Sequence, residues 1–194
     1  MTYKIDRSSG TELSSCAELL KSRRTINFYL DEPVPAEILE AAIDVARWAP
    51  NHRLTQPWHF YHLGDSGKTR VVDLIANIKS EGQGNDAYAA VARKLSKIPG
   101  WLVVTSNLSD DPILQQEDYA SCCCAIQNMM LYLWKAGVGV KWTSGKVTRD
   151  EQFFEILGIN MNEKMIVGLF WYGYPDHVPS QDRKTVEEIL IRLE

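Results

Sequence analysis

Apolar residues recur along the chain with two different periods, and these periods predict the order of helices and strands. Positions three or four residues apart share one face of an α-helix, whereas an unbroken apolar run is typical of a strand buried on both faces. The recurrences predict helices over 11–22, 35–49, 66–80, 86–96, 112–136 and 148–157, and strands over 56–63, 101–107, 138–145 and 164–175.

Local signals refine several of these boundaries. Gly137 is expected to end the long central helix, because glycine adopts the left-handed conformation found at helix ends. Thr148 followed by Glu151 has the spacing of a capping box, which predicts that the last helix begins at Thr148. The segment 25–30 is short, β-prone and closed by prolines, and 184–193 is expected to be a terminal helix or an arm.

The order of these elements predicts a single α+β domain over residues 1–194. The length suffices for one well-buried domain, and neither an internal repeat nor a linker divides it. Long helical stretches separate the few strands, which favours the α+β class. Glu117 and Asp118 are expected to be solvated or to cap a turn. Three tryptophans are expected in the core, namely Trp101, Trp134 and Trp171.

Composition excludes several classes of protein. A hydrophobic fraction of 45% with 24% charged residues is ordinary for a globular domain. A net charge of −4 argues against a general affinity for nucleic acid or anionic membranes. The longest uncharged apolar stretch, 119–134, is short for a membrane span and is expected to be a buried helix.

The beginning of the chain and its cysteines predict a cytoplasmic protein. The first fifteen residues are polar and lack the apolar segment of a secretory signal. The consecutive Cys122, Cys123 and Cys124 would point in different directions on a helix, so a metal claw is excluded. We expect them to be small buried side chains in a reducing compartment.

The common catalytic signatures are missing from the sequence. It has no glycine-rich dinucleotide fingerprint, no phosphate loop and no nucleophile elbow. The four histidines and four cysteines show no metal-ligand spacing. A hydrolase or a metalloenzyme would therefore need residues brought together from distant segments.

Two short segments carry candidate chemistry. Arg23 and Arg24 stand side by side before Thr25, and adjacent cations repel each other unless solvent or an anion separates them. The pair is either a solvated helix end or a site for a doubly charged anion, whose oxygens guanidinium groups bind well. The second segment, 48–60, reads WAPNHRLTQPWHF and is unusually rich in rigid aromatic and polar residues. It is either a functional loop or a well-packed corner between a helix and a strand.

Taken together, these segments resemble the nitroreductase family of flavoproteins. The resemblance rests on Arg-Arg before a hydroxyl residue, Val-Pro before a helix that ends in Ala-Pro, and Gln-Pro-Trp before a strand. It continues through GVGVKWTSG, KMIVGLFWYGYP and DRKTVEEIL, and so covers nearly the whole chain. It implies an α/β/α sandwich with a central, mostly antiparallel sheet flanked by helices, which forms an intertwined homodimer with FMN at the interface.

The resemblance also assigns roles to individual residues. FMN would be contacted through its phosphate, ribityl chain or pyrimidine edge by Arg23, Arg24 and Thr25. The loop that reaches the flavin of the partner chain would contain Pro50, Asn51, His52 and Leu54. The loop beside the isoalloxazine ring would consist of Trp142, Thr143, Ser144 and Gly145. A basic pair, Arg183 and Lys184, would reach the phosphate. Apart from the family pattern, Arg53 is a candidate to meet the phosphates of NADPH or NADH, with NADPH slightly favoured.

One position departs from the family pattern. Many members carry Lys or Arg near the flavin N1–O2 edge, where this chain has Asn27. A cation there stabilises the reduced flavin. We expect that role to fall to Arg23, Arg24 or His52.

The activity implied by the resemblance is that of an FMN-dependent NAD(P)H oxidoreductase. Hydride would pass through flavin N5 to a nitroaromatic, quinone or enone-type acceptor in a ping-pong cycle. Two alternatives stay open: altered redox chemistry such as dehalogenation or dehydrogenation, and flavin binding without catalysis. No metal, nucleic acid or membrane partner is expected.

Overall fold

The structure is a computed structural model that describes residues 10–193. Helices and strands follow the predicted order, with two additional 3-10 helices, η1 and η2. The helices are α1 (Gly10–Ser22), α2 (Ala36–Ala46), η1 (His52–Leu54), α3 (Asp65–Ser80), α4 (Asn85–Ser96), α5 (Pro112–Lys135), η2 (Lys146–Arg149) and α6 (Glu151–Leu157). The strands are β1 (Trp58–His62), β2 (Gly100–Asn107), β3 (Gly139–Thr143) and β4 (Lys164–Gly173).

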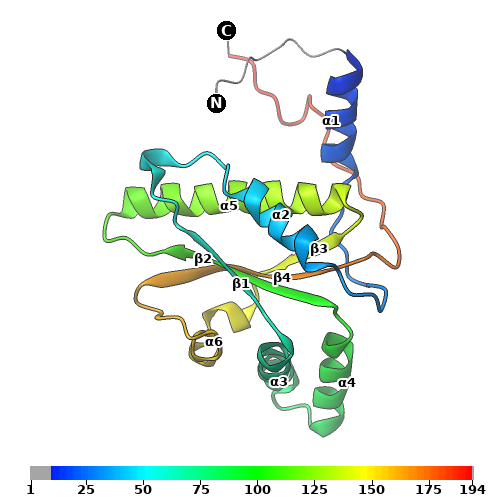
Figure 1. Cartoon of the computed structure of the whole chain (residues 1–194), viewed down its shortest axis with the longest axis vertical. Helices are drawn as coiled ribbons and strands as arrows, with labels where there is room; N and C mark the ends of the chain where they lie inside the picture. The colour runs from blue at the N-terminus through cyan, green and yellow to red at the C-terminus, as the bar shows by residue number, and fades with distance from the viewer. Residues whose placement is uncertain (1–9, 194) are drawn as a thin grey trace.

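The four strands form one sheet in the order β1-β2-β4-β3, and all neighbouring strands are antiparallel (Figure 1). β2 and β4 are central, so their residues are almost all buried, as the unbroken apolar runs predicted. The register between them shifts at Val104/Thr105, where a bulge interrupts the ladder. β1 and β3 form the two edges of the sheet.

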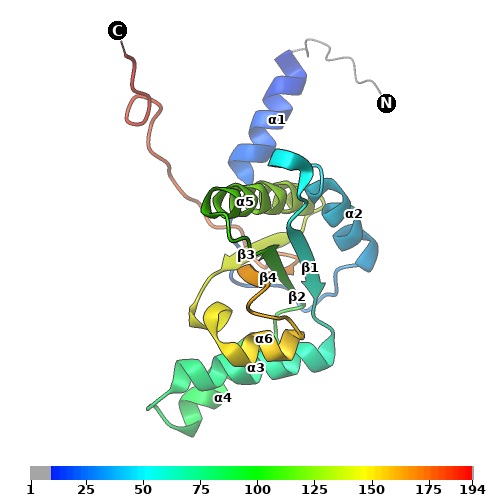
Figure 2. The same ribbon diagram turned by 90° about the vertical axis from the view of Figure 1, so that its left-hand side faces the viewer.

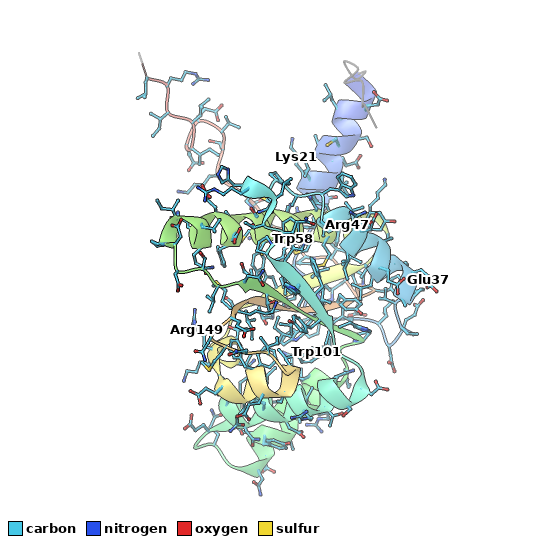
Figure 3. All side chains as sticks on the ribbon, turned by 60° about the vertical axis from the view of Figure 1, so that its left-hand side comes forward. Lys21, Glu37, Arg47, Trp58, Trp101 and Arg149 are labelled. Carbon is cyan, nitrogen blue, oxygen red and sulfur yellow. The ribbon has the colours of Figure 1, made fainter. Side chains whose placement is uncertain are left out.

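Helices cover both faces of the sheet (Figures 1 and 2). α2 and α5 pack on one face around Leu102 and Val104 of β2. α3, α4 and α6 lie on the other face, around Trp101 and Val103. Trp58 lies on the α5 side of the sheet and Trp101 on the α3 side (Figure 3). The alternation along β2 thus divides the core into two layers, and the predicted sandwich is confirmed.

Several helix ends are fixed by the residues found there. Asp111 begins α5, since its carboxylate accepts from the amides of Ile113 and Leu114, with Pro112 in the first turn. Gly137 has a φ of 80° and ends α5, as predicted. The predicted capping by Thr148 is wrong: its hydroxyl donates to the carbonyl of Gly145 within η2. Asp150 caps α6 instead, because its carboxylate accepts from the amide of Gln152.

Two segments predicted as a strand and as a terminal helix or arm have little regular secondary structure. Residues 25–30 form isolated bridges rather than a strand, through Thr25 with Val140 and Tyr29 with Pro175. Residues 181–193 form an exposed arm with a single turn, so the segment 184–193 is an arm and not a helix. The arm and α1 both extend beyond the layered body on the side of α5 (Figures 1 and 2). Over residues 10–193, no helix combines the length and apolar character needed to cross a membrane.

Candidate functional site

The segment that carries Arg23 and Arg24 runs along the open edge of β3. Ile26 is fully buried, and its amide donates to the carbonyl of Val140 at 3.2 Å. Gly139 makes this approach possible, because a Cβ there would lie 2.3 Å from Cγ1 of Ile26. Thr25 and Asn27, on either side of Ile26, are therefore exposed next to the edge strand.

Three arginines gather at this edge without an acidic partner. Burial lowers the pKa of Arg23, and the charges of Arg183 and Arg24 lower it further. Arg24 Nη1 donates to the carbonyls of Lys21 and Arg23, at 2.6 and 2.9 Å, so it caps the end of α1. Its Nε is buried and has no hydrogen-bond partner. Within the described part of the chain, none of the three forms an ion pair.

This arrangement bears on both interpretations of the arginine pair, as a solvated helix end and as a site for an anion. Arg24 does cap a helix end, but a partly buried Arg23 with an unpaired Arg183 beside it is no solvated surface. Like charges brought together out of water repel each other unless an anion lies between them. The cluster of Arg23, Arg24 and Arg183 therefore suits a phosphate group. Lys184 follows Arg183 on the same exposed arm.

The loop after β3 begins with a side chain that belongs to the core. Trp142 packs on Phe170 with ring centroids 5.4 Å apart, and its Nε1 donates to the carbonyl of Val167 at 3.2 Å. Thr143 turns the other way and donates to the carbonyl of Leu169 at 3.0 Å. Ser144 and Gly145 follow and are exposed. Trp142 therefore anchors the loop, and only its backbone faces the edge where a ligand would lie.

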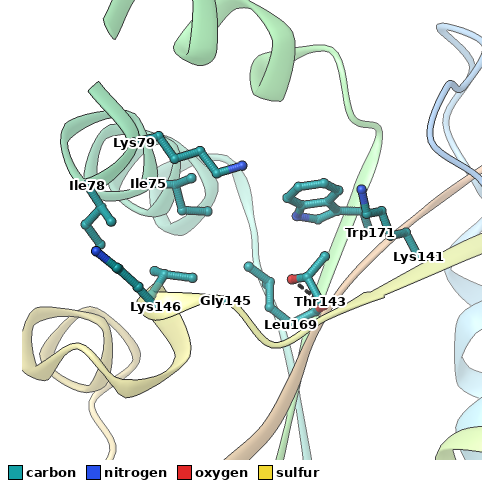
Figure 4. Close-up of a pocket in the computed structure, with 10 residues that line it drawn as sticks. Ile75, Ile78, Lys79, Lys141, Thr143, Gly145, Lys146, Leu169 and Trp171 are labelled. Carbon is teal, nitrogen blue, oxygen red and sulfur yellow. Dashed lines mark hydrogen bonds between the residues drawn. The ribbon is translucent and has the colours of Figure 1, made fainter. Parts of the chain in front are cut away.

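A pocket of about 410 Å³ opens on the Thr143 side of the sheet (Figure 4). Leu169 and Trp171 line it from β4, and Ile75 and Ile78 line it from α3. Gly145 lies at the same pocket, so the loop after β3 borders it. The indole Nε1 of Trp171 is buried without a hydrogen-bond partner. The pocket thus offers an apolar surface, large enough for a flat ring, beside exposed backbone of the loop.

The same pocket is basic. Lys79, Lys141 and Lys146 line it, and none of its lining residues is acidic. Lys141 Nζ donates to Oδ1 of Asn27 at 2.7 Å and lies 5.1 Å from the centre of the Trp171 ring. The pocket is therefore joined to the segment of Arg23 by a direct contact between β3 and Asn27.

The segment 79–100 is built into the second helical layer. α4 packs on α3, and Leu95 and Ile98 are buried in the core below them. The hydroxyl of Tyr88 on α4 donates to Oδ1 of Asp73 on α3 at 2.9 Å.

The loop 50–56 is held in an unusual conformation by a buried hydrogen-bond network. Arg53, Leu54 and Gln56 all have positive φ, between 46° and 58°. Such conformations cost free energy in residues other than glycine and persist only where surrounding contacts impose them. Asn51 accepts from the amide of Gln56 at 2.6 Å.

The network continues from this loop into α5. The side-chain amide of Asn51 donates to the hydroxyls of Thr55, at 3.0 Å, and Ser121, at 3.2 Å. Thr55 in turn donates to the carboxylate of Asp118, which is only 4% exposed. The expectation that Asp118 is solvated or caps a turn is wrong, because it is buried in the second turn of α5 under this loop.

The two groups of predicted flavin residues lie at different ends of α5 in one chain. Asn51 contacts Ser121, whereas Ser22, next to Arg23, accepts a hydrogen bond from Trp134. Thirteen residues of helix separate these contacts, which corresponds to about 20 Å. Trp134 is thus only half-buried and links α1 to α5 rather than lying in the core. A single chain does not bring Pro50, Asn51, His52, Arg53 and Leu54 to the arginine cluster.

Sequence reasoning missed the lysines of the pocket and the network of Asp118. Lys141 was visible as a charged residue inside an apolar strand, on the opposite face from Trp142. Asp118 gave no comparable signal, because its partner Thr55 is 63 residues away in the sequence. No group of three or more possible metal-binding side chains occurs among residues 10–193.

Comparison with known proteins identifies the family. A sequence profile described as the Nitroreductase family matches residues 20–174, which is most of the chain. The chain belongs to the nitroreductase family. Members of this family are flavin oxidoreductases, so this nitroreductase-family protein is an enzyme of that class.

Two relatives illustrate the breadth of the family. YfhC of Bacillus subtilis, named as an NAD(P)H nitroreductase, is 28% identical over 172 residues and matches 87% of this chain and 88% of YfhC. Iodotyrosine deiodinase 1 of Rattus norvegicus is 27% identical over 201 residues, with 91% of this chain and 68% of that protein covered.

Solved structures agree with the nitroreductase fold. A nitroreductase-like protein from Bacillus cereus superposes with a TM-score of 0.83 at 28% identity, over 100% of this chain and 99% of that chain. A protein from Desulfovibrio desulfuricans in complex with FMN gives a TM-score of 0.72 at 18% identity, over 92% and 96%. At that identity the second likeness concerns the fold alone.

Proposed function

We propose that the protein is an FMN-dependent NAD(P)H oxidoreductase that reduces nitroaromatic, quinone or enone-type acceptors. The observation that carries this proposal is the cluster of Arg23, Arg24 and Arg183, without ion pairs, together with a pocket that combines an apolar surface with lysines. A phosphate group suits the cluster and an aromatic ring suits the pocket, which are the two ends of FMN. Proteins similar to this chain bind FMN or are named as NAD(P)H nitroreductases, which supports the same assignment.

The residues of the chain would divide the binding of FMN between them. Arg23, Arg24, Arg183 and Lys184 would hold the phosphate, and Thr25 would offer its exposed hydroxyl to the ribityl chain. The exposed backbone of Ser144 and Gly145 would face the ring. Trp142 and Thr143 would fix the direction of this loop through their hydrogen bonds to β4. When bound, FMN would supply the redox chemistry, taking hydride at N5 from NAD(P)H and passing it to the acceptor in a ping-pong cycle.

We further propose that two chains form a homodimer with one FMN at each of two interface sites. Pro50, Asn51, His52 and Leu54 would then reach the flavin held by the partner's arginine cluster, and Arg53 would meet the phosphates of NADPH or NADH. Leu54 is 77% and Trp48 is 71% exposed in the single chain, which supports a partner at this loop.

The C-terminal arm supports the same assembly. Its apolar side chains are exposed, and Ile191 and Leu193 are 82% and 92% exposed. An exposed apolar arm of this kind is stabilised when it lies on a second copy of the chain. Since Arg183 belongs to the arm, docking of the arm would also fix one side of the phosphate site.

We also propose a cytoplasmic location. All four cysteines are free thiols, and Cys16 and Cys124 are exposed, which suits a reducing compartment. The expectation of three buried cysteines is wrong for Cys124, because only Cys122 is buried and Cys123 is half-buried. Burial raises the pKa of the Cys122 thiol to about 11, so it would remain unreactive.

An absorbance spectrum before and after anaerobic addition of NADPH, and separately NADH, tests the activity. The proposal expects flavin bands that bleach with either nicotinamide and return when a nitroaromatic, quinone or enone is added. Bands that persist with both reductants would contradict it and favour flavin binding without catalysis. A protein that stays colourless after incubation with FMN would contradict flavin binding itself.

Reductive dehalogenation is a second candidate, favoured by the likeness to iodotyrosine deiodinase 1. It differs from the first in its acceptor. An enzyme that releases halide from a halogenated aromatic faster than it reduces a nitroaromatic or quinone would belong to this second class.

A further inference from the structure

Three lysines from three different elements lie close enough for their charges to interact, and no carboxylate lines the pocket shared by Lys79 and Lys141. Burial lowers the pKa of Lys141 on β3, and the charges of Lys79 on α3 and Lys94 on α4 lower it further. None of the three forms an ion pair within residues 10–193. Positive charges held together in this way are unfavourable in the empty protein and favourable when an anion is bound.

Lys141 is the member of this group that is held in place. Its Nζ donates to Oδ1 of Asn27 at 2.7 Å, and its charge lies over the ring of Trp171 at 5.1 Å. Residues alternate along β3, so Lys141 and Thr143 face the pocket while Trp142 faces the core (Figure 4). The ammonium group therefore lies between Asn27 and the pocket proposed for the flavin ring.

We propose that Lys141 supplies the positive charge at the N1–O2 edge of FMN, in place of the neutral Asn27. This inference rests on the proposed function. A flavin that has taken up two electrons and one proton carries one negative charge, which N1 and O2 share. A cation at that edge binds the reduced form more tightly than the oxidised form and raises the reduction potential. Asn27 positions Lys141 by accepting its hydrogen bond.

The side chains expected to provide this charge are less well placed. Arg24 Nη1 already donates to two backbone carbonyls, and its neighbour Arg23 lies with Arg183 at the phosphate cluster. His52 would reach the site only from the partner chain, because in one chain its loop lies at the other end of α5. Lys141, by contrast, contacts Asn27, the position at which this chain departs from the family pattern.

The test compares the dissociation constants of oxidised and anaerobically reduced FMN in the dimeric protein. Lys141→Gln should weaken the binding of reduced FMN at least tenfold more than that of oxidised FMN. For a two-electron couple, that ratio lowers the midpoint potential of the bound flavin by about 30 mV. Lys141→Arg should retain the wild-type ratio, and Asn27→Lys combined with Lys141→Gln should restore it.

Lys146→Gln is the matched control, because Lys146 lines the same pocket but its ammonium group points away from Trp171 and Lys141 (Figure 4). It should leave the ratio within twofold. An unchanged ratio in Lys141→Gln, or an equal loss in both variants, would overturn the inference. If Lys141→Gln does not fold, Lys141→Met and the double variant decide. Lys141→Met should show the same tenfold change in the ratio, and the double variant should match wild type. A wild-type protein that binds no FMN would instead contradict the proposed function.

Discussion

The residue that best represents the proposed site is Arg23, which is partly buried beside two other cations. Burial and the charges of Arg183 and Arg24 lower its pKa, so the site is electrostatically unfavourable until an anion is bound. Such a residue lowers the stability of the empty protein and favours the binding of an anion. The arginine cluster therefore trades stability of the empty protein for affinity.

Arg23→Gln should weaken FMN binding by about tenfold to a hundredfold. A hydrogen bond to a charged partner contributes about 1.5–3 kcal/mol, and each 1.4 kcal/mol is a factor of ten. The free energy of unfolding of the apoprotein should be unchanged or raised, because a repulsion is removed. Fluorescence titration with FMN and urea unfolding measure the two effects.

The control for that variant is Arg70→Gln. Arg70 is exposed on α3, on the other face of the sheet from α5. Equal losses of FMN affinity in both variants would contradict a specific role for Arg23.

The burial of Tyr172 predicts that the folded protein loses stability at alkaline pH. Burial raises its pKa to about 12, and burial also raises the pKa of Tyr29. A tyrosine whose pKa is higher in the folded state contributes stability that is fully present below pH 10. That contribution is lost as the pH rises toward 12.

The urea midpoint should therefore fall between pH 10 and 12, and Tyr172→Phe should reduce the fall. Tyr132→Phe, at an exposed position, is the control and should leave the profile unchanged. A midpoint that is flat up to pH 12 would contradict the burial of these hydroxyls.

At the scale of elements, periodicity was enough to predict nearly every helix and strand. β2 and β4 are uniformly apolar because helices cover both faces of the sheet, and α5 begins and ends at residues with evident capping properties. Thr148 shows where local patterns fail. Its spacing to Glu151 fits a capping box. A 3-10 helix occupies Lys146–Arg149, however, so α6 begins after it and Asp150 is the N-cap.

The site was less predictable than the fold, for a physical reason. Residues 23–25 and 142–145 could be recognised because they are consecutive in the sequence. The contacts of Lys141 with Asn27, and of Asp118 with Thr55, join residues 114 and 63 positions apart. Only the tertiary structure brings such pairs together, and no short sequence pattern predicts them.

Gly168→Ala tests how the sheet supports the loop after β3. A Cβ at this position would lie 2.1 Å from Nε1 of Trp142 and 2.9 Å from Phe170, so the indole that anchors the loop must move. Overpacking of this kind costs about 1–3 kcal/mol of unfolding free energy. We expect that loss in urea unfolding, together with weaker FMN binding.

Gly67→Ala provides the opposite case. Gly67 lies in α3, and a Cβ there would make ordinary contact with Leu63 at 3.7 Å. Alanine should stabilise the helix by up to about 1 kcal/mol. A stable Gly168→Ala protein with normal FMN affinity would contradict the role given to Trp142.

Asp118→Asn tests the network under the loop 50–56. The carboxylate accepts from Thr55 in a buried position, and its loss should cost about 1–3 kcal/mol. Three residues of the loop have positive φ, so the loop should relax and become open to proteolysis and hydrogen exchange. Glu117→Gln makes the same change of charge on the half-exposed neighbour and should have little effect. Equal protection of the loop in both variants would contradict the network.

At the scale of the whole molecule, the residues proposed to bind FMN are divided between two places in a single chain. The arginine cluster and the loop 50–54 lie at different ends of α5, and the apolar residues of the arm and Trp48 are exposed. The proposed homodimer would account for these features together, because it would bring the loop of one chain to the cluster of the other.

The central claim is that two chains jointly hold FMN, and sedimentation velocity followed at 280 and 450 nm tests it most directly. The account predicts a single species of about twice the chain mass, 22.0 kDa, with one FMN for each chain. Removal of residues 180–194 should yield monomers that do not carry the 450 nm signal. FMN that sediments with a monomer, or a dimer that remains flavin-free when FMN is in excess, would contradict the account.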